Sequence, residues 1–89
     1  MARRTELTQK IGQVLRELRL ARGLSQEEFA HLCGVHKNYV GFVERGERSM
    51  LLETADAFAK GLGMTLSELL AELDKKKPTQ KSRAKNPSR

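Results

Sequence analysis

The chain has very few residues of the kinds that build secreted, membrane or metal-binding proteins. Its 89 residues contain one Cys, two Pro and no Trp. A single cysteine cannot form an internal disulfide, so a disulfide-stabilised secreted fold is disfavoured and a cytoplasmic location is expected. No apolar run approaches the roughly 18 residues that cross a bilayer, and no apolar segment follows the charged first residues, so we expect neither a signal peptide nor a membrane partner. Two His and one Cys show no metal-ligand spacing, and we expect no metal and no other cofactor.

Positive charge is in excess, but it is unevenly distributed. The 17 Lys and Arg against 11 Asp and Glu give a formal charge of +6. Residues 75–89 hold seven basic side chains, no acidic one and both prolines, which predicts a disordered basic tail. Residues 1–74 are predicted to form the one folded domain. Its first part, residues 1–48, carries nine basic against six acidic groups, so that part is the better candidate to bind a polyanion.

The residue types of the folded part favour helices. It has thirteen Leu against five Val and Ile, and no proline precedes position 78. Apolar residues recur with a period of 3.6 in two stretches, which begin at Leu7 and Leu52 and end before Gly23 and Gly63. Each stretch therefore predicts one amphipathic helix.

Two capping boxes mark the starts of further helices. Ser25 with Glu28, and Thr65 with Glu68, have the spacing at which side chain and backbone of a first turn bond reciprocally. Another short helix is expected over about residues 37–45. The predicted fold class is therefore all-α, a five-helix domain. Five short helices leave no room for an active-site cleft or a ligand domain, so we expect neither an enzyme nor a small-molecule effector.

The stretch from Gln26 to Arg45 has the pattern of a helix-turn-helix at the second and third helices. Two short helices meet at Cys33-Gly34-Val35, with too few residues between them for an antiparallel hairpin. Gly34 permits a sharp turn, the small Ala30 lets the next helix approach closely, and Val40 supplies a buried contact that locks the pair. We expect the cysteine to be a small core residue, with redox sensing as the less favoured alternative.

With these motifs the sequence resembles the phage repressor/Cro-like (Xre-type) helix-turn-helix regulators, especially the small controller proteins of restriction-modification systems. The resemblance covers about residues 8–73. The residues that carry it are Leu18-Arg19, Gly23-Leu24-Ser25-Gln26-Glu27-Glu28, Ala30, Gly34-Val35, Tyr39-Val40, Glu44-Arg45-Gly46 and Ala59-Lys60-Gly61-Leu62-Gly63. It implies a repressor-like DNA-binding domain, usually a homodimer on a two-fold-related operator, with the recognition helix at about 37–45 in the major groove. The chain departs from the family pattern at Met50 and Leu51, where Pro and Ser are common, and at His36, where a Ser, Thr or Asp cap is usual.

Carried over position by position, the resemblance implies a set of residues at the DNA. Gln26 would clamp a phosphate. The residues that would face the bases are Lys37, Asn38, Gly41 and Phe42. The resemblance also implies a buried structural ion pair between Arg19 and Glu44.

The chemistry of the third helix supports this assignment in part. Asn38 would bond adenine and Lys37 would reach guanine acceptors from the first helical turn, the alternative being solvated surface side chains. Phe42 follows Asn38 by four residues and shares its outward face, where it would contact a thymine methyl unless it belongs to the core.

Further phosphate contacts are expected around the recognition helix. The residues expected to make them are His36, Tyr39, Arg45 and Arg48. The alternative for the histidine is a helix cap, and the alternative for the tyrosine is simple packing. The fifth helix and its start carry more apolar residues than its own docking needs, so some should bury against a second subunit. These dimer-interface residues are Met64, Leu66, Leu70 and Leu73.

We therefore interpret the chain as a dimeric, sequence-specific DNA-binding transcriptional regulator whose partner is double-stranded DNA. Two other classes stay open. One is an antitoxin that also regulates its own toxin–antitoxin pair, and the other is a nucleoid-type protein that binds DNA without sequence preference. An enzyme is the least supported class, because the sequence has no nucleophile–base constellation and no metal-ligand set.

Overall fold

The computed structural model describes residues 5–75, and this range is helical without a strand. The helices are α1 (Glu6–Ala21), α2 (Gln26–Cys33), α3 (Lys37–Glu44), α4 (Leu52–Gly61) and α5 (Leu66–Lys75). The prediction of an all-α domain with five helices is confirmed. Lys75, which the sequence analysis assigned to the basic tail, is the last residue of α5, and the rest of that tail lies outside the described residues. Between residues 5 and 75, every helix is too short or too polar to cross a membrane.

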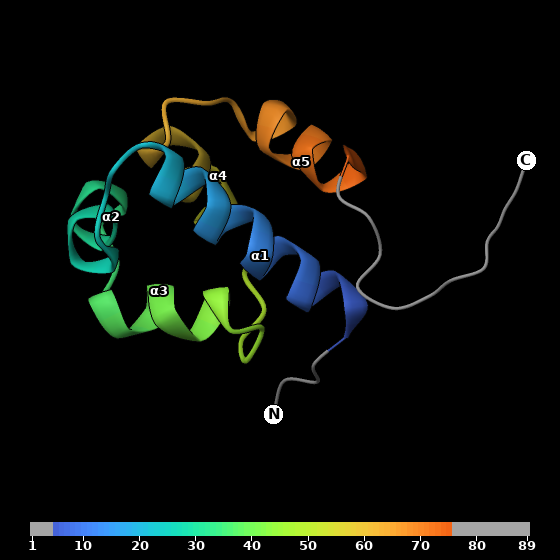
Figure 1. Cartoon of the computed structure of the whole chain (residues 1–89), viewed down its shortest axis with the longest axis horizontal. Helices are drawn as coiled ribbons and strands as arrows, with labels where there is room; N and C mark the ends of the chain where they lie inside the picture. The colour runs from blue at the N-terminus through green and yellow to red at the C-terminus, as the bar shows by residue number, and fades with distance from the viewer. Residues whose placement is uncertain (1–4, 76–89) are drawn as a thin grey trace, which may run out of the picture.

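Helix α1 runs through the middle of the molecule, with α3 and α5 on opposite sides of it (Figure 1). Helix α2 packs against α3 and α4, and α4 packs against α5. The rings of Phe29 and Phe58 stack at the centre with 5.4 Å between their centroids, which joins α2 to α4. The buried apolar side chains of the core are Ile11, Val14, Leu15, Phe29, Ala30, Val40, Val43, Phe58, Ala59, Leu62 and Leu69.

The predicted capping boxes fix the starts of two helices. The hydroxyl of Ser25 accepts a hydrogen bond from the Glu28 amide (3.0 Å), and the Glu28 carboxylate accepts one from the Ser25 amide (2.8 Å). The same reciprocal pair joins Thr65 and Glu68 at 3.1 and 2.9 Å. Each cap stabilises its helix by about 1 kcal/mol. Because a capping box needs specific residue types three positions apart, these two helix starts can be recognised in the sequence.

The turn between α2 and α3 has the geometry that the motif requires. Gly34 has φ 75° and ψ 30°, a left-handed conformation that residues with a side chain rarely adopt. Ala30 and Val40 are buried beside this turn. Cys33 is half-buried against the core, and burial raises the pKa of its thiol from 9.0 to about 11. This cysteine therefore has the properties of a core residue and not those of a reactive thiol.

Candidate DNA-binding surface

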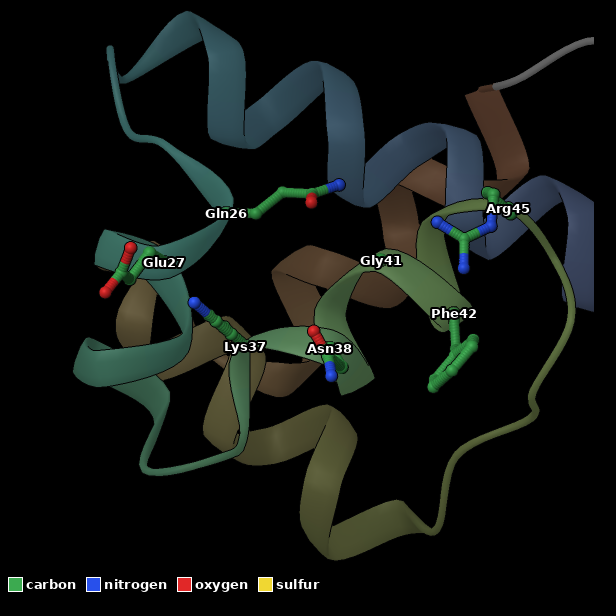
Figure 2. A pocket seen from close by; sticks show the side chains of 7 residues that line it. All are labelled: Gln26, Glu27, Lys37, Asn38, Gly41, Phe42 and Arg45. Carbon is green, nitrogen blue, oxygen red and sulfur yellow. The ribbon is translucent and has the colours of Figure 1, made fainter.

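Six of the nine residues expected at the DNA line one hollow between the start of α2 and the outward face of α3 (Figure 2). The residues that line it are Gln26, Glu27, Lys37, Asn38, Gly41, Phe42 and Arg45. The helix-turn-helix brings these two segments of the chain together. Glu27 was not among the expected residues, and its carboxylate partly offsets the positive charge of Lys37 and Arg45.

The first turn of α3 presents Lys37 and Asn38 at one end of the hollow, with both residues exposed. His36 precedes this turn, and its Nδ1 accepts a hydrogen bond from the Asn38 amide at 3.1 Å. The capping alternative for His36 is therefore present in the structure. Its contact with a phosphate stays a prediction.

Gly41 leaves space in the middle of the hollow. A Cβ at this position would lie 3.1 Å from Nη1 of Arg45, which is tighter than ordinary van der Waals contact. It would lie 3.5 Å from Oε1 of Gln26, which is an ordinary contact. The glycine therefore lets an amide and a guanidinium group converge over α3. Both groups donate hydrogen bonds of the kind that phosphate oxygens accept.

The ion pair expected between Arg19 and Glu44 is present and buried, with side chains 6% and 3% exposed. Nε and Nη2 of Arg19 donate to the two carboxylate oxygens at 2.6 and 3.0 Å. Nη1 of Arg19 donates to the carbonyl oxygen of Leu24 (2.8 Å), so the guanidinium is well satisfied. Nε2 of Gln26 also donates to Glu44 (3.0 Å), which holds that amide at the hollow and leaves its second N–H for another acceptor.

Two arginines meet the aromatic ring at the other end of the hollow. The guanidinium carbons of Arg45 and Arg48 lie 5.3 and 4.8 Å from the ring centroid of Phe42. Arg45 also donates from Nε and Nη2 to the carboxylate of Glu47 at 3.1 and 3.3 Å. Phe42 is half-buried, so it belongs neither fully to the core nor fully to the surface.

Tyr39 departs from the expectation of a phosphate contact. Its hydroxyl donates to the carbonyl oxygen of Ser49 (3.2 Å), and its ring stacks against Phe58 with 6.2 Å between centroids. The hydroxyl proton is therefore used within the protein in this conformation. The structure favours the packing alternative for this residue.

The four residues expected at a dimer interface do not lie on one surface. Leu70 and Leu73 of α5 line an apolar hollow together with residues of α1, α4 and the segment before α4. Leu66 is half-buried, whereas Met64 packs against the core and lines a separate hollow beside Arg22. Only part of the expected set therefore shares a face.

The apolar hollow contains leucines that sequence analysis did not assign to an interface. Leu7, Leu51, Leu52 and Leu70 are 61%, 72%, 67% and 43% exposed. Together with Leu73 we call them the leucine face. Leu7 and Leu52 begin the two periodic apolar stretches, yet both are exposed, because they lie in a first helical turn at the edge of the core. Leu51 is the N-cap of α4 and makes no side-chain capping bond there. The sequence signal for this surface was the departure from the family pattern at Met50 and Leu51.

Comparisons with known proteins agree with the helix-turn-helix formed by α2 and α3. A family model described as helix-turn-helix (HTH_3) matches residues 15–69. The control protein C.BamHI of Bacillus amyloliquefaciens is 37% identical over 60 residues, which are 66% of this chain and 74% of that protein. The crystal structure of the restriction-modification controller protein C.AhdI from Aeromonas hydrophila has a TM-score of 0.70 at 46% identity, covering 73% of this chain and 98% of that one. A C.Esp1396I variant bound to its highest affinity operator site OM is similar in fold, with a TM-score of 0.75 at 24% identity over 80% of this chain and 93% of that one.

Proposed function

The chain belongs to the helix-turn-helix family of DNA-binding transcription regulators, and from this premise we propose that it binds a two-fold-related operator as a homodimer. Helix α3 would lie in the major groove of each half-site. The protein would act in the cytoplasm on double-stranded DNA, with neither catalysis nor a cofactor as part of its role.

The observation that carries the proposal is the convergence of the DNA candidates on one hollow of the α2–α3 unit. Residues that the helix-turn-helix motif singles out come together there from two helices. In the proposed complex, Lys37 and Asn38 read bases, while Gln26, Arg45 and Arg48 hold phosphates. The relatives named control proteins, and the similar fold seen on an operator, support the same assignment.

The leucine face supports the dimer. Exposed leucines that gather in one apolar hollow mark a contact surface more often than scattered ones do. Buried between two copies, the face would link two recognition helices into one unit. Such a unit reads half-sites about 34–36 Å apart.

Selection of binding sites from random DNA tests the proposal. We expect the full-length protein to enrich a motif with two-fold symmetry, and we expect its complex with that motif to contain two chains by analytical ultracentrifugation. Binding without an enriched motif would favour the nucleoid-type alternative. Co-purification with a small toxin would favour the antitoxin alternative, and no binding to any duplex would overturn the proposal.

A further inference from the structure

Phe42 is the contact point of two cationic side chains on the DNA-facing side of α3. The guanidinium groups of Arg45 and Arg48 both lie within the distance at which an aromatic ring attracts a cation. Arg45 is the C-cap of α3 and Arg48 follows three residues later, before α4 begins. The ring therefore joins the end of the recognition helix to the segment that leaves it.

The two arginines differ in what else holds them. Arg45 has a second partner, the carboxylate of Glu47. For Arg48, the ring of Phe42 is the only partner among residues 5–75. An arginine side chain without a partner has many rotamers, and ordering it on a phosphate costs conformational entropy. A ring that already holds the guanidinium group lowers that cost, because less freedom remains to be lost on binding.

We propose that Phe42 is a positioning residue: its ring holds the guanidinium groups of Arg45 and Arg48 in place for DNA phosphates beside the recognition helix. This inference rests on the proposed function and gives Phe42 a different role from contact with a thymine methyl. A methyl contact needs an apolar side chain of sufficient reach, whereas a cation–π contact needs an aromatic face. The two roles therefore respond differently to substitution.

Substitution with an aliphatic and with an aromatic residue separates the two roles. Binding is measured for the full-length protein on two duplexes, the site selected from random DNA and one random-sequence duplex, over a series of salt concentrations. We expect Phe42→Leu to weaken binding to both duplexes by similar factors, about two- to five-fold for each arginine released. The slope of log K against log salt should become shallower by about 0.9 for each phosphate that the protein no longer neutralises. Phe42→Trp keeps an aromatic face and should restore both the affinity and the slope.

A double-mutant cycle shows whether Phe42 acts through the arginines. In an Arg45→Gln/Arg48→Gln background, Phe42→Leu should change neither affinity nor salt slope, because no cation remains to be positioned. Circular dichroism of each variant, recorded below its Tm, confirms that the affinities compare folded proteins. Phe42 is half-exposed, so Phe42→Leu is expected to fold.

Two results would overturn the inference. One is a Phe42→Leu protein that keeps the wild-type affinity and salt slope. The other is a loss confined to the selected site that disappears when its thymines are replaced by uracils, since that assigns Phe42 to a methyl group. A wild-type protein that binds neither duplex would instead overturn the proposed function itself.

Discussion

Lys37 and Asn38 occupy the part of α3 that enters the major groove first in helix-turn-helix complexes. In the proposed complex each side chain would reach one or two base edges, so its loss should relax the preference at one position of each half-site. We expect Lys37→Ala or Asn38→Ala to cost about 1–3 kcal/mol on the selected site and much less on a duplex changed at that base pair. Binding to a panel of single-base variants of the site measures this pattern.

Lys60→Ala is the matched control for the change of charge. Lys60 lies on α4, exposed and 3.0 Å from the carboxylate of Asp56, away from the hollow. Its removal should leave the ranking of the site variants unchanged. Equal losses on every duplex for Lys37→Ala and Asn38→Ala would show that these two residues hold phosphates and do not read bases.

The Arg19–Glu44 pair connects the stability of the domain with the placement of Gln26. Arg19→Met leaves a buried carboxylate without its cation, and such losses cost roughly 3–5 kcal/mol. We expect a lower Tm and a lower free energy of unfolding by chemical denaturation. Replacement of both partners, Arg19→Met with Glu44→Leu, should recover a large part of the loss, because no charge then stays buried unpaired.

Arg16→Met provides the comparison for that experiment, since Arg16 lies exposed on the same helix. It should change the free energy of unfolding by no more than about 0.5 kcal/mol. If Arg19→Met and Arg16→Met had the same Tm as the wild type, the pair would contribute nothing measurable. The double variant should still bind DNA more weakly than the wild type, because Gln26 loses the acceptor that orients it.

Residue positions were predictable from the sequence where the motif fixes them, and less so where tertiary contacts decide. The helix-turn-helix resemblance singled out Gln26, Lys37 and Asn38, and the structure brings all three to one hollow, while their roles at DNA stay predictions. The partner of Tyr39 is a backbone carbonyl ten residues away, and the stacking of Phe42 on two arginines depends on the path of the chain after α3. Neither contact has a periodic signature, so sequence patterns could not find them.

At the scale of elements, the leucine face joins the first turns of α1 and α4 to the exposed side of α5. A charge placed there should prevent two copies from burying it while leaving the helices intact, because the side chains concerned are exposed in one copy. We expect Leu51→Glu and Leu70→Glu to be monomeric at micromolar concentration by analytical ultracentrifugation, with unchanged far-UV circular dichroism. Their affinity for the two-fold site should fall steeply, because two half-sites are no longer held by one linked unit.

Leu32→Glu is the control for this prediction. Leu32 is also an exposed leucine, but it lies on α2 in a different hollow. Its substitution should leave the dimer intact, which separates an effect of position from an effect of an added charge. A wild-type protein that is monomeric both free and on DNA would contradict the prediction.

Many helix boundaries were predictable because local chemistry sets them, through the two capping boxes at the starts of α2 and α5 and the glycines that follow α1 to α4. The way the helices pack was less visible. A Cβ at Gly12 would lie 2.7 Å from the carbonyl oxygen of Glu44, so this glycine lets α1 and α3 meet backbone to backbone. In the sequence Gly12 is only a glycine within a predicted helix. Its role in close packing becomes clear once α3 is known to be the partner of α1.

At the scale of the whole molecule, charge follows the arrangement of the helices. Lys37, Arg45 and Arg48 lie on or just after α3, whereas Glu68, Glu72 and Asp74 lie on α5, on the opposite side of α1 (Figure 1). A polyanion bound along α3 therefore avoids the acidic helix. Charge counts in the sequence predicted that the first part of the folded domain is the more basic part. The topology explains how the basic residues of α3 and the acidic residues of α5 come to lie on opposite sides of α1.

The basic residues beyond α5 give the last prediction. Residues 76–89 contain six basic and no acidic side chains, while residues 1–75 carry eleven basic against eleven acidic groups, so the tail supplies the whole excess of positive charge. Phosphate contacts made by such a segment add affinity without sequence information.

The structure places the cut after Lys75, because this residue ends α5 and pairs with Glu72 at 3.2 Å. We expect the truncated protein to bind the selected site and random DNA more weakly by similar factors, with a salt slope shallower by about 0.9 for each phosphate that the tail no longer neutralises. A full-length chain with the six basic residues changed to Gln should behave like the truncated one. If both variants kept the wild-type affinity and slope, the tail would serve solubility or a protein partner instead.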